Sequence, residues 1–213
     1  MDSKALFSDQ LERGLSQMGI SASVEQQRLL VSYLLLFEKW NKAYNLSAVR
    51  DREQMISRHL LDSLVVLPLL RGKRFIDVGT GGGLPGIPLA IMKPDCEFTL
   101  LDSNGKKTRF LFQVKTELEL NNVTVENRRV ESFKPAAAFD GVISRAFASL
   151  RDMVDGCESL VNAEGRFWAL KGVYPETELS DLPKHYNVEA CHPLDVPGCD
   201  GERHLLEIRR QPD

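Results

Sequence analysis

The sequence predicts an α/β fold, in which helices cover a mostly parallel, doubly wound sheet. Three observations lead to this prediction: strand-like and helix-like segments alternate from residue 74 onward, a glycine-rich turn follows the first strand, and a helical stretch precedes it. Alternating strands and helices are typical of parallel sheets. Right-handed crossovers then place the ligand crevice at the carboxyl ends of the strands.

The composition is that of a globular protein with a full hydrophobic core. The 213 residues are 43% hydrophobic and 27% charged, and the formal net charge of −3 does not indicate a nucleic-acid ligand. The N-terminus has no signal-peptide pattern, and no apolar run is long enough to span a bilayer. Four cysteines without C-x-x-C spacing indicate reduced thiols. We therefore expect a cytoplasmic protein without membrane contact, and a monomer.

Capping signals predict three helices before the first strand. Gly19 follows a first amphipathic helix as a stop signal. Ser23 and Gln26 form a capping box that opens the second helix. Asp51 caps the third, which ends near Pro68.

Residues 1–70 are thus expected to form a helical cap that packs on the sheet of residues 71–213, within one compact unit. Basic side chains gather in or near the two later helices, with Asp51 and Glu53 as the acids that offset them. Such a patch predicts contacts with RNA phosphates, and an ordinary solvated face is the alternative. The members of this patch are Lys39, Lys42, Arg50, Arg52 and Arg58.

The remaining elements follow in alternation. The expected strands are 74–78, 97–101, 123–126, 140–144, 166–170, 186–190 and 204–208. The expected helices between them are 84–92, 106–120 and 150–161. Residues just past the strand ends are the candidates for chemistry.

The glycine-rich turn after the first strand predicts a nucleotide-binding corner. Glycines permit positive φ and close approach of a ligand to the backbone, and the next helix begins here. The dinucleotide pattern G-x-G-x-x-G is present as Gly81, Gly83 and Gly86, but it is a weak signal alone.

Two acids decide which ligand suits this corner. Asp77 ends the first strand beside the glycines, where a carboxylate would repel a pyrophosphate but suit S-adenosylmethionine, which carries an ammonium and a sulfonium. Asp102 ends the second strand, where an acid can accept the two ribose hydroxyls. The alternative interpretation is that both acids cap the helices that follow them.

Other strand ends supply further candidates. Val130 and Glu131 fall where an adenine would lie, or in an ordinary loop. Arg145, at the middle of the sheet, is costly to bury without a partner, so we expect it to anchor a phosphate, the substrate or the cofactor; a structural ion pair is the alternative. Lys171 points toward the same crevice and could meet RNA phosphate. His59 on the helical cap is more typical of a packed residue than of a catalyst.

A metal site is not expected. Some metal-ligating residue types cluster near the C-terminus, but their spacing fits no usual zinc pattern. These residues are Cys191, His192, Cys199 and His204.

The series of motifs resembles the bacterial ribosomal RNA small subunit methyltransferase G family. The similar blocks are residues 40–47, 59–64, 76–90, 101–107, 144–146 and 170–172, in the order of the family. The resemblance implies a seven-stranded class I S-adenosylmethionine-dependent methyltransferase fold, Rossmann-like, with an N-terminal helical cap.

The resemblance also implies a reaction and a site. The methyl group of S-adenosylmethionine goes to N7 of a guanosine in the 530 loop of 16S rRNA, bare or in the 30S particle, and S-adenosylhomocysteine is released. The cofactor contacts that the resemblance implies are Gly79, Leu84, Val130, Glu131 and Arg145. The residue chemistry adds Asp77, Gly81 and Asp102.

Guanine N7 has a free lone pair and no proton to lose, so the reaction needs no general base, and none is identified in the sequence. Arg145 and Lys171 are expected to position the substrate. Two alternatives remain: a methyltransferase with another substrate, and an NAD-type dinucleotide-binding protein.

Overall fold

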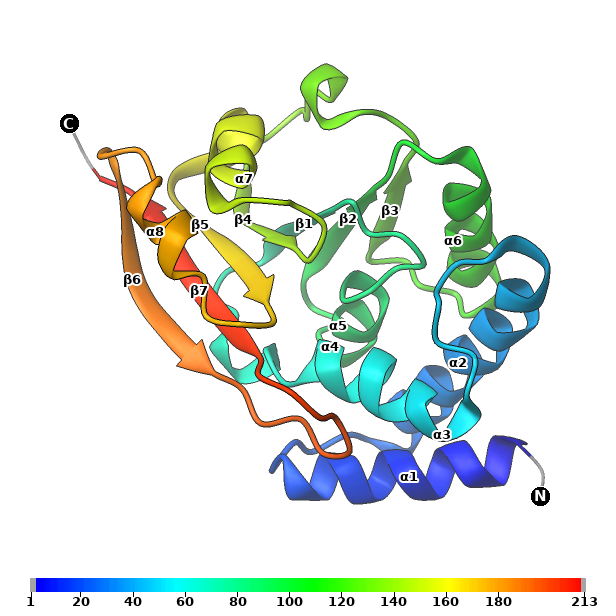
Figure 1. The fold of residues 1–213 in the computed structure, drawn as a ribbon. Helices are drawn as coiled ribbons and strands as arrows, with labels where there is room; N and C mark the ends of the chain where they lie inside the picture. Colours follow the sequence, from blue (N-terminus) through cyan, green and yellow to red (C-terminus); the bar gives the residue numbers. More distant parts are fainter. Residues whose placement is uncertain (1–2, 212–213) are drawn as a thin grey trace.

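In the computed structural model, which describes residues 3–211, seven strands form one twisted sheet in the order β3-β2-β1-β4-β5-β7-β6 (Figure 1). Neighbouring strands from β3 to β5 run parallel, whereas β7 is antiparallel to both β5 and β6. The strands are β1 (Arg74–Val78), β2 (Glu97–Leu101), β3 (Val123–Glu126), β4 (Phe139–Ser144), β5 (Val161–Lys171), β6 (Tyr186–Pro193) and β7 (His204–Arg210). The predicted mostly parallel sheet is confirmed.

The helices flank the sheet and precede it. They are α1 (Ser3–Gln17), α2 (Val24–Tyr44), α3 (Arg52–Met55), α4 (Asp62–Leu64), α5 (Gly86–Met92), α6 (Gly105–Glu117), α7 (Leu150–Cys157) and α8 (Glu176–Ser180). None of the helices in residues 3–211 is long and apolar enough to cross a membrane.

The order of the strands creates the ligand crevice. From β1 the chain moves outward through β2 and β3, then returns to β4 on the other side of β1. The segments that follow β1 and β4 therefore leave the sheet in opposite directions. This is a topological switch point, where open α/β sheets bind ligands.

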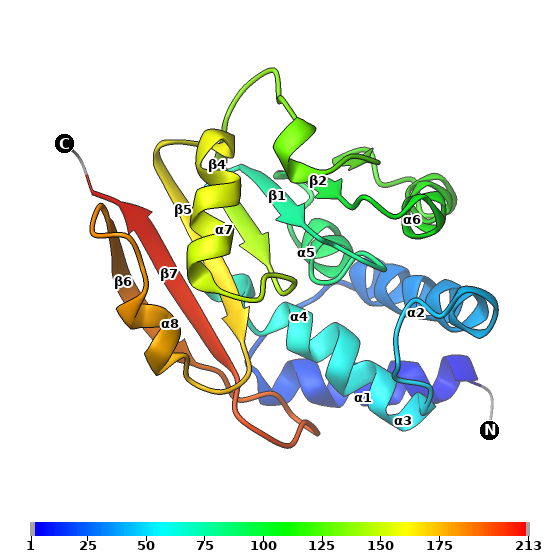
Figure 2. The same cartoon turned by 45° about the horizontal axis from the view of Figure 1, so that its top comes forward.

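Two hydrophobic clusters lie on opposite faces of the sheet. Side chains alternate along β1, so Phe75 joins the cluster of α1 to α6, whereas Ile76 and Val78 join the cluster of α7. Figure 2 shows α7 in front of β4 and β5, with α5 and the N-terminal helices beyond the sheet. Asp77 has the parity of Phe75 and belongs to the α5 face.

The N-terminal helices pack mainly against α5 and α6. The predicted capping box of α2 is confirmed, since Ser23 and Gln26 bond each other's backbone N–H groups. The Gln26 amide also donates to the carbonyls of Ile91 and Met92 at the end of α5. The hydroxyl of Tyr33 donates to the carbonyl of Gly82 in the glycine turn, at 2.7 Å. The Tyr33 bond fixes the turn from the helical side, and the Gln26 bonds hold the far end of α5. The division into a cap and a sheet domain stays a prediction.

Some boundaries differ from the predicted ones. Asp51 caps α3 as expected, but the helix continues through a π-helical turn, Ile56–Leu61, before α4. β5 begins at Val161, ahead of Gly165, because Val161 already pairs with Phe139 of β4. Helix α8 was not predicted.

Candidate active site

The glycine turn between β1 and α5 adopts backbone angles that favour glycine. Gly79, Gly81 and Gly83 have φ of +72°, +61° and +91°. A Cβ on Gly79 would lie 2.5 Å from the Cβ of Ala146, which follows β4. The turn is thus in close contact with the segment beyond β4, and a larger residue at position 79 would displace one of them.

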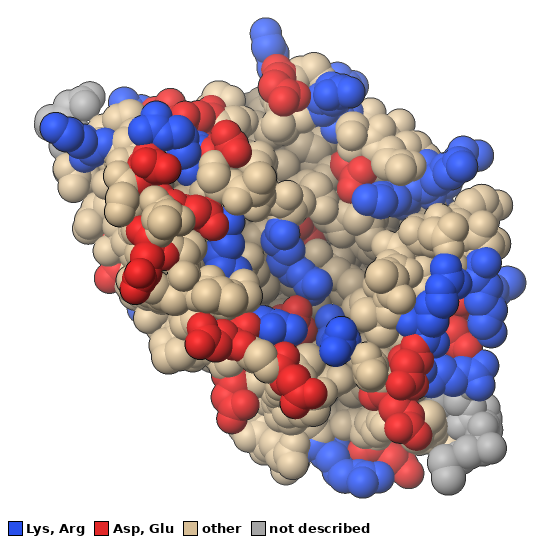
Figure 3. Space-filling model, viewed as in Figure 1, with Lys and Arg blue, Asp and Glu red and all other residues tan. Residues whose placement is uncertain are grey.

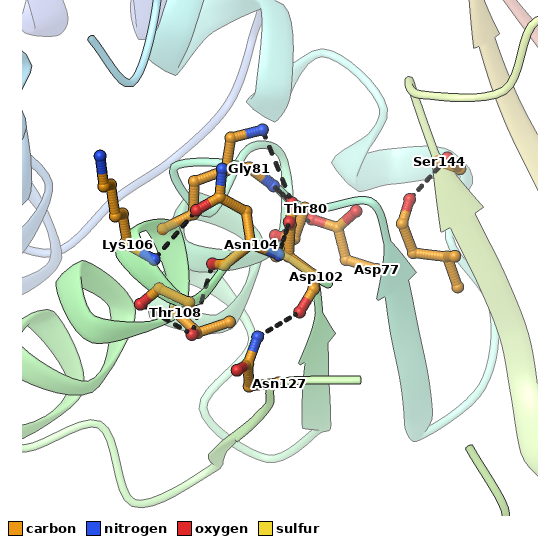
Figure 4. Close-up of polar contacts among 12 residues, drawn as sticks. Asp77, Thr80, Gly81, Asp102, Asn104, Lys106, Thr108, Asn127 and Ser144 are labelled. Carbon is orange, nitrogen blue, oxygen red and sulfur yellow. Dashed lines mark hydrogen bonds and ion pairs between the residues drawn. The ribbon is translucent and has the colours of Figure 1, made fainter. Parts of the chain in front are cut away.

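Asp77 fixes the conformation of this turn through hydrogen bonds. Its Oδ2 accepts a hydrogen bond from the Thr80 hydroxyl at 2.7 Å (Figure 4). The same oxygen accepts from the Gly86 N–H at 2.9 Å. Its Oδ1 is buried and has no partner among the described residues. Burial raises the pKa of Asp77 to about 6, against the effect of its hydrogen bonds. The capping interpretation is correct for Oδ2, because Gly86 begins α5, but it leaves Oδ1 unexplained.

Asp102 organises the neighbouring strand end. Its Oδ2 accepts from the Gly81 N–H at 2.9 Å and its Oδ1 from the Asn104 N–H at 2.8 Å. The cap of α6 is Asn104, whose side chain accepts from the N–H of Lys106. Asp102 therefore joins the glycine turn to the loop after β2, as Figure 4 shows, and does not itself cap α6.

A first cavity of about 220 Å³ opens over β1, β2 and the segment after β3. Four predicted cofactor residues line it: Gly79, Asp102, Val130 and Glu131. Leu84 packs instead against the hydrophobic core. Phe147 also lines this cavity and was not predicted, although it follows the end of β4 by three residues.

The turn after β4 is held by Ser144. Its hydroxyl donates to the Val78 carbonyl at 2.7 Å and accepts from the Ala146 N–H at 3.0 Å. This bridges β1 and β4 at the switch point. The turn stands between two cavities, because Phe147 lines the first and Arg145 lines the second.

The second cavity, of about 350 Å³, lies at the carboxyl ends of β4 and β5 and against the helical segment. Arg58, Arg145 and Lys171, all predicted candidates, line it. Arg145 Nη1 lies 3.0 Å from Asp62 Oδ2, so the structural ion pair weighed as the alternative is present. Arg203 Nε lies 2.9 Å from the other oxygen of Asp62. No sequence signal pointed to Arg203, which is 141 residues from Asp62.

His59, in the π-helical turn before α4, lines the second cavity and is almost fully buried. Its ring lies against Phe37, with centroids 4.9 Å apart, and neither ring nitrogen has a hydrogen-bond partner among the described residues. Burial lowers the pKa of His59 to about 4, so the ring is neutral at pH 7.

Lys171 is less available than its sequence position indicated. Its Nζ lies 2.7 Å from Glu178 Oε2 and donates to the Phe147 carbonyl at 3.3 Å. The side chain is 14% exposed. Lys171 therefore ties α8 to the turn after β4, and its contact with RNA stays a prediction.

Two cations of the predicted basic patch pair with a buried acid that the sequence count left out. Glu38 lies 2.6 Å from Arg52 and 3.2 Å from Lys42, and although burial acts to raise its pKa, these two cations hold it below the usual value. Arg50 bonds the side chain of Asn45. Lys39 and Arg58 are exposed and form no ion pair with the described residues.

The charges surround the hollow of the molecule. In Figure 3, Lys and Arg side chains gather over α2 and α6 and around a hollow near the centre of this face.

Among residues 3–211, no three His, Cys, Asp or Glu side chains come together as a metal site.

The chain is similar to known proteins over nearly its whole length. The family model for rRNA small subunit methyltransferase G matches residues 26–206. Ribosomal RNA small subunit methyltransferase G of Stutzerimonas stutzeri is 59% identical over 204 residues, which are 95% of this chain and 95% of that protein. The protein of the same name from Pseudomonas aeruginosa PAO1 is 55% identical, again over 95% of each chain.

Solved structures support the fold. The N-methyltransferase NodS from Bradyrhizobium japonicum has a TM-score of 0.55 and 15% identity, covering 77% of this chain and 100% of that chain. Precorrin-6y C5,15-methyltransferase from Geobacter metallireducens has a TM-score of 0.54 and 17% identity, covering 70% and 87%. The fold is that of the class I S-adenosylmethionine-dependent methyltransferases, as predicted.

Proposed function

The chain belongs to the rRNA small subunit methyltransferase G family, and from this premise we propose that it methylates N7 of one guanosine in the 530 loop of 16S rRNA. It is an S-adenosylmethionine-dependent rRNA methyltransferase. The single observation that carries the proposal for the site is the pair of cavities on either side of the turn after β4. One cavity would hold the cofactor and the other the RNA base.

The first cavity fits S-adenosylmethionine. Asp77 does not itself line this cavity, but it directly precedes Val78 and Gly79, which do, and its unpartnered Oδ1 is a buried acceptor that a ligand ammonium would satisfy. Each oxygen of Asp102 accepts one bond within the protein and keeps a second lone pair for ribose hydroxyls. Val130 offers an apolar surface to the adenine. A pyrophosphate on the glycine turn would lie near Asp77 and Asp102, which disfavours the dinucleotide alternative, although Arg128 and Arg129 line the same cavity.

When bound, S-adenosylmethionine supplies a methyl group on a sulfonium: the N7 lone pair forms the new bond to carbon as the carbon–sulfur bond breaks, and the electron pair stays on sulfur. No proton leaves N7, so the protein needs no general base. Its contribution is to hold N7 in line with the methyl group and to stabilise the positive charge that appears on the purine.

The protein's own residues support this division of work. Ser144 holds β1 and β4 together at the point where the two ligands would meet. Arg145 and Lys171 line the substrate side and would position the RNA, and exposed Lys39 and Arg58 would meet its phosphates. We further propose that the protein acts as a cytoplasmic monomer on 16S rRNA, bare or within the 30S particle.

The test uses labelled S-adenosylmethionine and small ribosomal subunits from cells that lack this protein. We expect labelled 7-methylguanosine after digestion of the 16S rRNA, and none from large subunits or from protein. Bare 16S rRNA, run beside intact subunits, shows which form is the substrate. Label in another nucleotide or only in protein would overturn the proposal, and binding of NAD in preference to S-adenosylhomocysteine would reopen the dinucleotide alternative.

A further inference from the structure

We propose that the second cavity receives the target guanine and that the Asp62 carboxylate, held between Arg145 and Arg203, reads the Watson–Crick edge of that base. The inference rests on the proposed function and adds to it the residue that selects guanine.

The second cavity lies where the acceptor base must come. It opens at the carboxyl ends of β4 and β5, separated from the first cavity by the turn that carries Arg145. It is polar, and its volume of about 350 Å³ is in the range of small-ligand sites. A base in folded RNA is read most readily after it is splayed from its stack into such a pocket.

The chemistry of N7 methylation restricts how the base can be read. Proteins most often recognise guanine with an arginine that donates to both O6 and N7. That contact would occupy the lone pair of N7, which is the nucleophile here. A guanine-N7 methyltransferase must therefore use the opposite edge, where N1–H and the N2 amino group are both donors, and it needs an acceptor there.

Asp62 is that acceptor. Of the described residues that line the second cavity, Asp62 alone carries a carboxylate, and it is 7% exposed. Arg145 binds one of its oxygens at 3.0 Å and Arg203 binds the other at 2.9 Å. A carboxylate has about four lone-pair sites, so each oxygen keeps one for the base. The same ion pairs engage Arg145 and Arg203 and keep them from N7, whereas Arg58, the third arginine of the lining, is the one expected to meet RNA phosphate.

His59 supplies the complementary donor. It lines the same cavity beside Asp62, and its two unpartnered ring nitrogens are the second observation that points to a ligand. Because the ring is neutral, it carries one N–H, which would meet guanine O6. An adenine would place an amino group opposite this donor and an unprotonated N1 opposite Asp62, and both contacts would be lost.

Asp62 also acts on the reaction itself. When N7 gains the methyl group, the purine becomes cationic and its N1–H and N2–H groups become stronger donors. Their hydrogen bonds to a buried carboxylate therefore strengthen as the charge develops, which favours the transition state over the bound substrate.

The experiment compares guanosine with inosine, which lacks the N2 amino group but keeps N7. 16S rRNA with either nucleoside at the target position is assembled into 30S particles, and kcat/KM for methyl transfer is measured. We expect wild-type protein to prefer guanosine by about tenfold or more. In Asp62→Ala and Asp62→Asn, activity falls on guanosine and the preference shrinks toward one, while S-adenosylhomocysteine binding is kept. His59→Phe, which retains the ring packing on Phe37, lowers activity on both substrates and keeps the preference.

Glu207→Gln is the matched control. Glu207 is also a buried carboxylate held by an arginine, with Arg166 at 2.8 Å, but it lies on β7 outside both cavities. Its variant should keep the wild-type preference. Equal wild-type rates on guanosine and inosine, or a full preference in a folded Asp62 variant, would overturn the inference alone. No methylation of the guanosine substrate by wild-type protein would overturn the proposed function with it.

Discussion

The two oxygens of the Asp77 carboxylate have different surroundings, since Oδ2 accepts two hydrogen bonds and the buried Oδ1 accepts none from the described residues. Oδ2 shapes the glycine turn and the start of α5. Burial raises the pKa of the group to about 6. The same residue thus organises the loop and, under the proposed function, would also meet the ammonium of the cofactor.

A pH dependence of cofactor binding follows. A ligand ammonium favours the ionised carboxylate, so affinity for S-adenosylhomocysteine should be full above the pKa of about 6 and fall as the pH drops below it, approaching tenfold per pH unit. Calorimetric titration between about pH 5 and pH 8 measures this. In Asp77→Asn the affinity should be lower and the profile flat. Parallel profiles in the two proteins would contradict the assignment.

Among individual residues, the sequence was most informative for site candidates that lie just past the end of a strand. Gly79, Asp102, Val130 and Glu131 were candidates from their positions past strand ends, the family resemblance also implied three of them, Gly79, Val130 and Glu131, and the structure brings all four to one cavity. Arg203 was not predictable, because its partner Asp62 is brought to it by the whole fold.

Helix α8 joins three neighbours through Glu178. The carboxylate accepts from the Leu150 N–H at the start of α7, at 2.8 Å, and pairs with Lys171 at the end of β5. Lys171 in turn donates to the carbonyl of Phe147. A short helix that the sequence did not predict therefore fixes the turn between the two cavities.

Removing that carboxylate should loosen the turn. Glu178→Ala leaves the N–H of Leu150 and the mostly buried ammonium of Lys171 without their acceptor, so we expect unfolding free energy to fall by about 1–3 kcal/mol. Chemical denaturation measures the change. Glu176→Ala, at an exposed position of the same helix, should change stability by less than about 0.5 kcal/mol. Equal losses of unfolding free energy in the two variants would show that helix propensity, and not the contacts of the Glu178 carboxylate, is responsible.

Among the elements, the strands were predicted best, because each is a short apolar run bounded by turn residues. The capping box of α2 was equally readable, since its signal is local. The π-helical turn before α4 and the early start of β5 were not, because both depend on packing and on pairing with residues far along the chain.

Over the whole molecule, a net charge of −3 coexists with a basic surface around the central hollow (Figure 3). Internal ion pairs occupy Lys42, Arg52, Arg145 and Lys171. Lys39, Arg50 and Arg58 remain exposed and without an ion pair among residues 3–211. They are the best placed of the predicted cations to neutralise phosphates.

Salt dependence of RNA binding tests this selection. Lys39→Ala and Arg58→Ala should each weaken binding across sequences and reduce the slope of log Kd against log salt by about one. Binding of 16S rRNA between about 50 and 200 mM salt gives the slopes. Arg28→Ala, which removes an exposed cation already paired with Glu25, should leave the slope unchanged. Unchanged slopes in the first two variants would place the RNA elsewhere.

The overall patch was only partly predictable. Counting charges along residues 39–58 gives five cations against two acids, but the fold brings Glu38 against two of the cations. Sequence proximity shows which charges are near each other along the chain, whereas burial and pairing decide which remain available to a partner.

From the ion pair between Asp62 and Arg203 we also expect an order of assembly. The first cavity needs residues 78–147, but the second needs residues 47–204 and closes a span of 141 residues between Asp62 and Arg203. Long spans close late, because their entropy must be lost before the contact forms. As the chain emerges during synthesis, the cofactor half can take shape while the base pocket is still incomplete. If the start of β7 frays in the mature protein, selectivity for the base is lost before affinity for the cofactor.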